Sequence, residues 1–227
     1  MAKEFKKRLT TSIILTLLTI FSIFLNQVVF LFSLLVVVGI SFYEISEMIK
    51  KIFKTVKNIR YFLYNLLAIY YGLIIFIPTA MILHSPYTNL NTNISTGSVF
   101  FLFILLICIF SDTGGYVIGK SIGGKKLSNI SPNKTISGSV GSFFFSLFPL
   151  FIFNYFNANE YFINLENIFF SLQISLICQA GDLFISYLKR KANVKDTGNI
   201  LPGHGGILDR VDGIFFAIPL AWLLLSY

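Results

Sequence analysis

Near its end, the chain carries a polar segment whose residue types suit phosphate and metal chemistry. Residues 196–212 read DTGNILPGHGGILDRVD and contain three acids, one arginine, one histidine and four glycines. Asp209 and Asp212 are three positions apart and share a face if a helix has begun there. Carboxylate oxygens suit Mg²⁺, which commonly bridges carboxylates to substrate phosphates. The segment therefore favours a magnesium-dependent phosphate site.

Two further acids lie in or beside apolar stretches. Asp182 falls inside such a stretch, where charged residues are costly and usually mark a functional site. A helix would place it on one face with other polar residues at intervals of four, three, four and three positions: Ser175, Gln179, Asp182, Ser186 and Lys189. Asp112 likewise shares a helical face with Tyr116 and Lys120. Polar stripes on membrane helices must face protein or a water-filled cavity.

Two loops could supply contacts to phosphate. The run PGHGG has three glycines, which permit positive φ and let backbone N–H groups form an anion-binding nest. Cations around it could neutralise a polyphosphate: Lys189, Arg190, Lys195 and Arg210. A second loop, GKSIGGKKLSNISPNKTISG at residues 119–138, has similar chemistry but does not match the Walker A pattern.

Each of these residues also has an ordinary structural interpretation. Asp209 alone could be a helix cap, and Asp112 could be a solvated residue at the membrane interface. His204 could be a common loop histidine, because the only other histidine, His84, is assigned to the opposite side of the membrane. The lysine and arginine runs could serve only as topology signals, and the second loop could be a flexible connection.

The composition indicates what must position these groups. Soluble domains carry roughly 25% charged residues, whereas this chain has 12% charged and 55% hydrophobic residues. The sequence therefore predicts an all-α, polytopic integral membrane protein with about seven transmembrane helices. Their expected ranges are about 10–25, 28–46, 62–83, 98–118, 138–156, 164–187 and 211–227.

The distribution of positive charges supports this set of seven predicted spans. The 18 lysines and arginines fall in four clusters, at residues 3–8, 50–60, 120–134 and 189–210. Seven spans put all four clusters on one side, and the positive-inside rule makes that side cytoplasmic. The net charge of +8 is thereby explained by topology and by attraction to anionic lipids, without a nucleic-acid partner. On this topology, four carboxylates from three helices could meet in one cavity at the cytoplasmic face.

The segment Ser186–Asp212, SYLKRKANVKDTGNILPGHGGILDRVD, resembles the signature of the phosphatidate cytidylyltransferase (CDP-diacylglycerol synthase) family. Every fixed position of that signature is met: Ser186, Lys189, Arg190, Lys195, Asp196, Gly198, Pro202, His204, Gly205, Gly206, Asp209, Arg210 and Asp212. SDTGGYVIGK and SPNKTISG also resemble family segments. We expect one membrane domain over 1–227, with the catalytic helices and cytoplasmic loops at 105–227 and poorly matched N-terminal helices at 1–100.

The second loop departs from the family pattern at two positions. The family typically has S-P-K-K-T-x-E-G, whereas this chain has Ser131-Pro132-Asn133-Lys134-Thr135-Ile136-Ser137-Gly138. Asn133 replaces a lysine and Ser137 replaces a glutamate, which puts an essential role for those two positions in doubt. The main signature is unaffected.

The resemblance implies transfer of the cytidylyl group of CTP to phosphatidic acid, giving CDP-diacylglycerol and pyrophosphate. We expect an integral protein of a bacterial-type inner (cell) membrane, whose active site faces the cytoplasm on the topology above, and the resemblance also suggests a homodimer in the lipid bilayer. Mg²⁺, or another divalent cation, would bind Asp182, Asp209, Asp212 and, less directly, Asp112.

Other roles follow from the same resemblance. The expected catalytic residues are Lys189, Arg190, Lys195, Asp196, His204 and Arg210. Among these, the lysines and arginines would hold phosphates, and His204 could donate a hydrogen bond to one. The expected substrate-binding residues are Ser186, Lys134, Gly203, Gly205 and Gly206.

Three other functions compete with this one. A transporter would need polar groups across the whole membrane, whereas here they crowd one face. A CDP-alcohol phosphotransferase has D-G-x2-A-R followed by G-x8-D-x3-D, which this chain lacks. A lipid-binding scaffold that kept the signature without activity stays open on the sequence alone.

Overall fold

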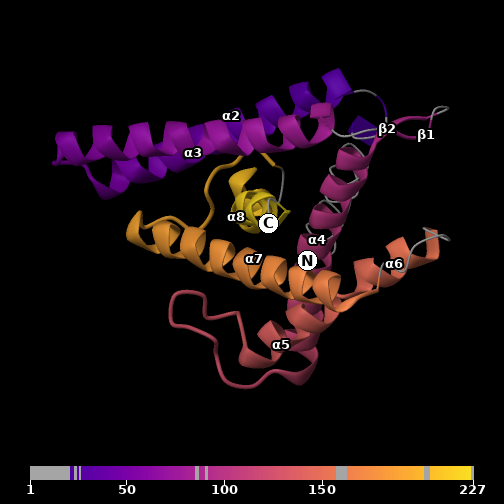
Figure 1. The fold of residues 1–227 in the computed structure, drawn as a ribbon. Helices are drawn as coiled ribbons and strands as arrows, with labels where there is room; N and C mark the ends of the chain where they lie inside the picture. The colour runs from indigo at the N-terminus through magenta and orange to yellow at the C-terminus, as the bar shows by residue number, and fades with distance from the viewer. Residues whose placement is uncertain are drawn as a thin grey trace. The chain divides into compact units, whose positions relative to one another are not determined.

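The protein is a set of long apolar helices joined by loops (Figure 1). The computed structural model describes residues 21–22, 25, 27–84, 87–89, 92–156, 163–201 and 205–225. Its helices are α2 Gln27–Ile52, α3 Lys57–His84, α4 Thr96–Ile122, α5 Ile136–Phe145, α6 Phe148–Phe156, α7 Leu165–Lys191 and α8 Leu208–Leu225. The prediction of an all-α membrane protein is confirmed.

Within the described ranges, four stretches are long and apolar enough to cross a membrane. They are Val28–Ile52, Val99–Ile122, Ile136–Phe156 and Leu165–Lys191. The expected span at 10–25 falls almost entirely outside the described residues. The total of seven spans therefore stays a prediction.

Several helices run further than their apolar segments suggested, and α2 and α7 show the reason. α2 continues past residue 46 to Ile52, and α7 continues past residue 187 to Lys191. Both last turns are basic, with Lys50 and Lys51 in α2 and Lys189, Arg190 and Lys191 in α7. Cations stabilise the negative end of the helix dipole, and their long stems can cover apolar surface. Helix formation therefore persists beyond the apolar run.

The expected span at 138–156 is interrupted. α5 ends at Phe145 and α6 begins at Phe148, with a turn between them. Pro149 lies in the first turn of α6 and has no N–H to bond a carbonyl of α5, so it fits a helix start better than a helix interior. At the other end, Thr135 caps α5 by accepting a 3.1 Å hydrogen bond from the Gly138 N–H.

The loop expected at 84–97 contains a short hairpin. Strands β1 (Tyr87–Asn89) and β2 (Thr92–Ser95) pair antiparallel, with Tyr87 opposite Ser95 and Asn89 opposite Thr92. No strand was expected there, because the segment is too short to show an alternating pattern of hydrophobic residues.

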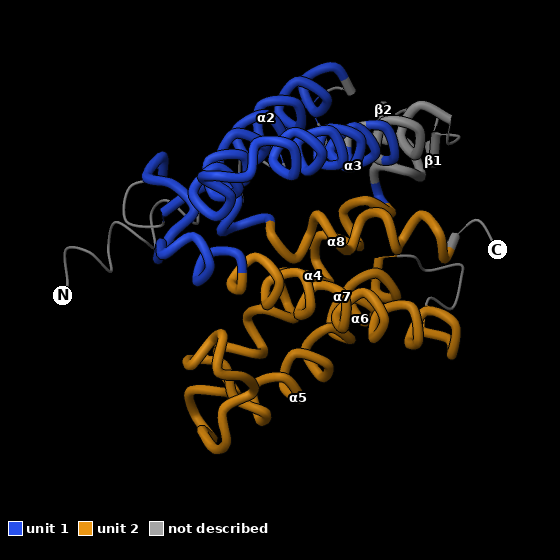
Figure 2. Tube along the Cα trace, turned by 90° about the vertical axis from the view of Figure 1, so that its left-hand side faces the viewer, with its two compact units in different colours: residues 1–99, 188–211 blue, residues 100–187, 212–227 orange. Residues whose placement is uncertain are grey.

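The chain divides into two compact units, coloured separately in Figure 2. Unit 1 comprises residues 1–99 and 188–211, and unit 2 comprises residues 100–187 and 212–227. Each unit therefore combines segments that are distant in sequence. The expected organisation into a single membrane domain with a catalytic part at 105–227 stays a prediction.

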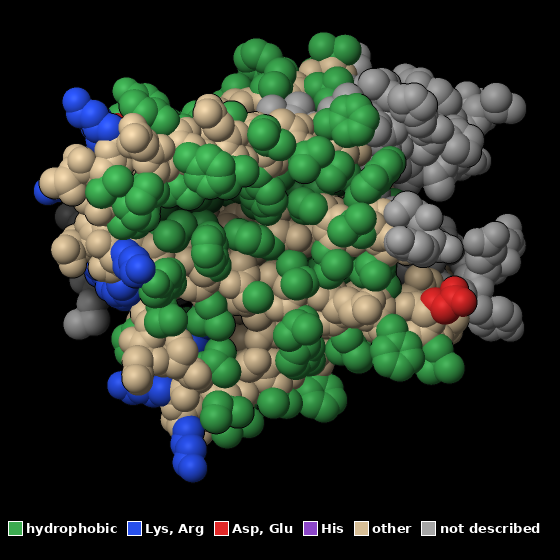
Figure 3. Space-filling model, turned by 60° about the vertical axis from the view of Figure 1, so that its left-hand side comes forward, with side chains coloured by type: hydrophobic (Ala, Val, Ile, Leu, Met, Phe, Trp, Pro, Cys, Tyr) green, Lys and Arg blue, Asp and Glu red, His purple; other side chains and the backbone are tan. Residues whose placement is uncertain are grey.

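In unit 1, α2 and α3 form a helical hairpin. Phe42 of α2 meets Tyr71 of α3 edge to face, with ring centroids 5.5 Å apart. The opposite side of α3 exposes large apolar side chains at helical spacing: Phe62, Leu66, Ile69, Leu73 and Phe76. Hydrophobic side chains cover much of the face drawn in Figure 3. An exposed apolar face of this kind suits contact with lipid tails.

In unit 2, α4 packs against the other helices through aromatic and small residues. Phe103 of α4 is fully buried and its ring lies 5.0 Å from that of Phe153 in α6. The α7 and α8 backbones approach each other closely. A Cβ at Gly181 would lie 2.6 Å from a Phe216 ring carbon, and one at Gly213 would lie 2.4 Å from Cys178 Sγ. Small residues permit such close helix packing in membranes.

Candidate active site

The polar stripe of α7 faces protein, as its spacing predicts. Ser175 is fully buried, and its hydroxyl is 2.8 Å from that of Ser111 in α4. The Gln179 side chain donates to Ser175 over 3.3 Å and accepts from Ser139 of α5. Within unit 2, these bonds join three helices on the polar side of α7. Asp182, the next polar residue of this stripe, lies one turn further along α7.

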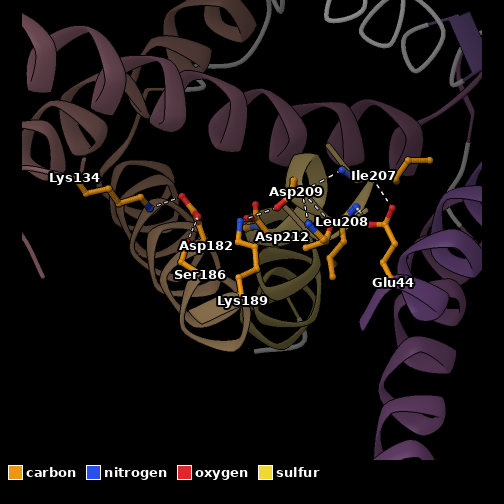
Figure 4. Close-up of polar contacts among 12 residues, drawn as sticks. Glu44, Lys134, Asp182, Ser186, Lys189, Ile207, Leu208, Asp209 and Asp212 are labelled. Atoms are coloured by element: carbon orange, nitrogen blue, oxygen red, sulfur yellow. Dashed lines mark hydrogen bonds and ion pairs between the residues drawn. The ribbon is translucent and has the colours of Figure 1, made fainter. Parts of the chain in front are cut away.

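Asp182 forms an ion pair with Lys134 of the α4–α5 loop (Figure 4). The two side chains keep 26% and 28% of their surface exposed, respectively. Ser186, one turn along α7, also donates to Asp182 over 3.4 Å. Three residues expected to bind substrate or metal are thus brought together in unit 2.

The α4–α5 loop holds Lys134 in an ordered backbone arrangement. The Leu127 N–H donates to the Lys134 carbonyl over 2.8 Å, and the backbones of Lys126 and Thr135 pair as an isolated antiparallel β-bridge. The Ser137 hydroxyl donates to the Gly123 carbonyl and closes the base of the loop. Ser137, one of the two departures from the family pattern, therefore has a structural role here. Asn133, the other, is exposed.

Asp112 and Asp212 also belong to unit 2. The Cys178 Sγ of α7 lies 4.0 Å from an Asp112 oxygen, and α8 packs on the same cysteine at Gly213, the neighbour of Asp212. Asp212 is buried, and one of its oxygens accepts from the Gly213 N–H over 2.8 Å. The carboxylates of α4 and α8 are thus placed near one point on α7.

These carboxylates have the hard oxygen donors that Mg²⁺ prefers. Among the described residues, no group of three or more acids, histidines or cysteines lies close enough to hold a metal by itself. Mg²⁺ usually needs only one or two carboxylates, because waters and substrate phosphates complete its shell. The donor chemistry fits the ion, and its binding to Asp182, Asp209, Asp212 or Asp112 stays a prediction.

In unit 1, Asp209 lies in the first turn of α8 and is held from several sides. Lys189 Nζ is 2.7 Å from one carboxylate oxygen, and the side chains of Lys189 and Asp209 are only 15% and 6% exposed. The other oxygen accepts from the Thr197 N–H at 2.8 Å, the Thr197 hydroxyl at 3.0 Å and the Gly206 N–H at 3.1 Å. Asp209 therefore organises the α7–α8 loop.

These contacts set the charge of Asp209. Burial raises the pKa of its carboxyl, but the hydrogen bonds from Lys189, Thr197 and Gly206, together with the Lys189 charge, outweigh burial and hold the pKa below its ordinary value of 3.8. Hydrogen bonds to the charged form of a carboxyl stabilise that form. Asp209 is consequently ionised at neutral pH.

The glycine-rich run has part of its expected geometry. Gly205 adopts φ +86°, as the nest interpretation requires, and a Cβ there would lie 2.9 Å from an Asp209 oxygen. The N–H groups of Gly206, Ile207 and Leu208 all point at carboxylates of the protein itself. The predicted roles of Gly203 and His204 fall on positions outside the described residues.

Four charged signature residues lie on the surface of unit 1. Arg190, Lys195, Asp196 and Arg210 are exposed. Long exposed cations can reach a polyphosphate without a large desolvation cost. Their expected contacts with phosphate stay predictions.

A further acid, Glu44, was not predicted from the sequence to take part in the site. It lies within the apolar helix α2, is 2% exposed, and accepts hydrogen bonds from the α7–α8 loop. The rule that drew attention to Asp182, that a charge inside an apolar span usually marks a site, applies equally to Glu44.

Comparison with known proteins identifies the relatives of this chain. A model of the cytidylyltransferase family matches residues 54–227, well over half of the chain. The chain belongs to the cytidylyltransferase family. The resemblance drawn from the residues at 186–212 is thereby confirmed.

Curated relatives within this family carry a specific name. The phosphatidate cytidylyltransferase of Staphylococcus aureus (strain COL) is 46% identical over 138 residues, which are 58% of this chain and 50% of that protein. The phosphatidate cytidylyltransferase of Bacillus subtilis (strain 168) is 41% identical over 136 residues, 59% of this chain and 50% of that protein. The chain spans about half the length of the curated relatives it matches.

Proposed function

We propose that this cytidylyltransferase-family chain transfers the cytidylyl group of CTP to phosphatidic acid. A phosphate oxygen of phosphatidic acid attacks the α-phosphorus of CTP, and the bond between that phosphorus and the β-phosphate bridging oxygen breaks. The products are CDP-diacylglycerol and pyrophosphate. The attacking phosphate is already ionised at neutral pH, so no general base is required. Positioning and charge neutralisation would supply most of the catalysis.

One observation carries the proposal. The signature at 186–212 covers the end of α7, the start of α8 and the polar loop that connects them, in a chain similar to relatives named phosphatidate cytidylyltransferase. Lys189 and Asp209 are fixed to each other within that loop. A lipid-embedded chain with an ordered phosphate-type loop suits a reaction between a nucleotide and a lipid headgroup.

The residues have distinct proposed roles. Lys189, Arg190, Lys195 and Arg210 would bind the phosphates of CTP and offset charge on the leaving pyrophosphate. Lys134 would do the same from the α4–α5 loop, where Asp182 now balances its charge. Mg²⁺, held by Asp182, Asp209 and Asp212, with Asp112 as an outer contact, would neutralise phosphate charge when bound.

The assay is direct. Purified protein in detergent is given CTP, phosphatidic acid and Mg²⁺, and both CDP-diacylglycerol and pyrophosphate are measured. We expect the two products in equal amounts, loss of turnover in EDTA, and recovery with added Mg²⁺. Folded protein that makes neither product would favour the scaffold or transporter alternatives. Turnover that persists in EDTA would remove the metal from the proposal.

We further propose that the chain lies in a bacterial inner membrane as a homodimer, with its basic loops in the cytoplasm. Single cysteines at Asn91 and Ser128, in a background lacking Cys108 and Cys178, test the orientation with an impermeant thiol reagent on intact cells. We expect labelling at Asn91→Cys only. Labelling at Ser128→Cys alone would reverse the topology, and sedimentation in detergent measures the subunit number.

A further inference from the structure

Glu44 is a buried carboxylate surrounded by hydrogen-bond donors of the α7–α8 loop. One oxygen accepts from the Ile207 N–H at 3.1 Å, and the other accepts from the Leu208 N–H at 2.8 Å and the Thr197 hydroxyl at 2.8 Å. Figure 4 shows Glu44 directed at the start of α8. Glu44, Thr197 and residues 207–208 all belong to unit 1.

The contacts explain how a charge is tolerated inside an apolar helix. Leu208 is the first residue of α8, where backbone N–H groups lack partners within the helix and the dipole favours negative charge. Glu44 supplies acceptors for two such N–H groups from a different helix. A buried charge that is hydrogen-bonded in this way avoids most of the cost of desolvation.

The surrounding backbone leaves room for this carboxylate. A Cβ at Gly206 would lie 2.4 Å from one Glu44 oxygen, and a Cβ at Gly198 would lie 2.5 Å from the other. Side chains at either position would displace the carboxylate. The glycines of the signature thus make a cradle for a group that lies outside the matched range of residues 54–227.

Thr197 connects Glu44 to Asp209. Its hydroxyl is 2.8 Å from Glu44 and 3.0 Å from Asp209, and its N–H donates to Asp209. Asp209 in turn pairs with Lys189. A displacement of Glu44 would therefore shift Thr197, which also contacts Asp209 of the Lys189–Asp209 ion pair.

We propose that Glu44 is a positioning residue, which clamps the α7–α8 loop and so fixes the orientation of Asp209 and Lys189 for catalysis. The inference rests on the proposed function. Glu44 itself need not touch substrate. Small displacements of catalytic groups can cost about 10²-fold in rate, so the clamp should act on kcat more than on KM.

Three variants and a control test the clamp. Glu44→Gln replaces one acceptor oxygen with an NH₂ group that cannot accept from a backbone N–H. Thr197→Val removes the shared hydroxyl while keeping the shape of the side chain. The third variant combines the two changes. Glu47→Gln is the matched control, because Glu47 lies one turn along α2, is 39% exposed, and pairs with the exposed Lys50 at 3.2 Å.

For folded Glu44→Gln we expect kcat to fall at least about tenfold with a smaller change in KM for CTP, because orientation is lost more than binding. The double variant should be little worse than the more damaging single variant, since both act on one connection. Glu47→Gln should match wild type. The inference is overturned if folded Glu44→Gln keeps kcat within threefold of wild type, or if the two losses multiply in full.

A second measurement does not need activity. Amide hydrogen exchange at Ile207 and Leu208 should be at least about tenfold faster in Glu44→Gln than in Glu47→Gln, because unprotected amides exchange through local opening. Unchanged exchange would overturn the clamp even in an active enzyme. If wild type fails to turn over CTP and phosphatidic acid, the proposed function falls, and this exchange result alone decides whether Glu44 holds the loop.

Discussion

The α7–α8 loop and the α4–α5 loop hold their acidic partners differently. Asp209, in unit 1, is 6% exposed and accepts hydrogen bonds from a lysine and from three further donors of its own loop. Asp182, in unit 2, is 26% exposed and is balanced by a single lysine, with a weak hydroxyl contact beside it. A charge held by many protein donors contributes to the scaffold as well as to any ligand site, whereas one with a single, partly exposed partner can exchange that partner for a ligand.

Asp209→Asn tests the scaffold side of this comparison and should have the largest effect. It removes the charge that pairs with buried Lys189, and breaking a buried pair costs about 3–5 kcal/mol of stability. Turnover should fall by about 10²-fold or more. Denaturant unfolding in detergent and the product assay measure the two effects. Glu166→Gln, an exposed acid of α7, serves as the control. A fully stable Asp209→Asn variant would contradict the scaffold assignment.

Asp182→Asn should separate activity from stability. A partly exposed ion pair contributes about 0–1 kcal/mol to folding, so unfolding should change little. Loss of a charged metal ligand should still reduce turnover about 10²-fold or more. The same two measurements apply. Near-normal turnover in folded Asp182→Asn would show that this acid is not a metal ligand. A large loss of stability would show that Asp182 supports the fold as strongly as Asp209 does.

Acid should erase the stability difference between wild type and Asp209→Asn. Because the pKa of Asp209 is lowered in the folded chain, its ionised form stabilises folding above the unfolded pKa near 3.8. That contribution is lost as pH falls through the folded pKa, which lies below 3.8. Unfolding of both proteins at pH 7, 5, 4 and 3 should show a constant difference down to about pH 5 and a shrinking one below pH 4. A difference that stays constant to pH 3 would contradict the assigned contacts.

Ser137→Glu should have the smallest effect. The glutamate restores the family residue but cannot donate to the Gly123 carbonyl when ionised, so the loop loses one closing hydrogen bond. The Leu127–Lys134 backbone bond remains. Turnover should therefore change within about tenfold, or about 1.4 kcal/mol of barrier. Ser137→Ala isolates the loss of the hydroxyl. A gain of about a hundredfold would mean that the family glutamate is needed for full activity.

The sequence was most informative where a pattern has a single physical explanation. The four-three spacing on α7 predicted a stripe facing protein, and Ser175, Gln179 and Asp182 make the corresponding contacts. The apolar runs predicted most helices, because lipid requires backbone groups to bond within a segment. Pro149 could have predicted the break between α5 and α6, but an apolar run alone hides it.

Other features depend on distant pairing, which local patterns do not contain. Nothing around Ile207 and Leu208 indicates that their N–H groups donate to a carboxylate from α2. The glycine run permits positive φ, and Gly205 adopts it. It did not predict which acceptors the neighbouring N–H groups would find, because these depend on the packing of helices far apart in the sequence.

The partners of Glu44 also bear on the order in which the chain is assembled. Glu44 and the groups that bind it are separated by 153 to 164 positions. During synthesis, α2 emerges long before Thr197, Ile207 and Leu208, so its carboxylate has none of these donors for most of translation. A nascent chain that stops before residue 197 contains none of these donors, so the environment that holds Glu44 is completed only when the last part of the chain is made.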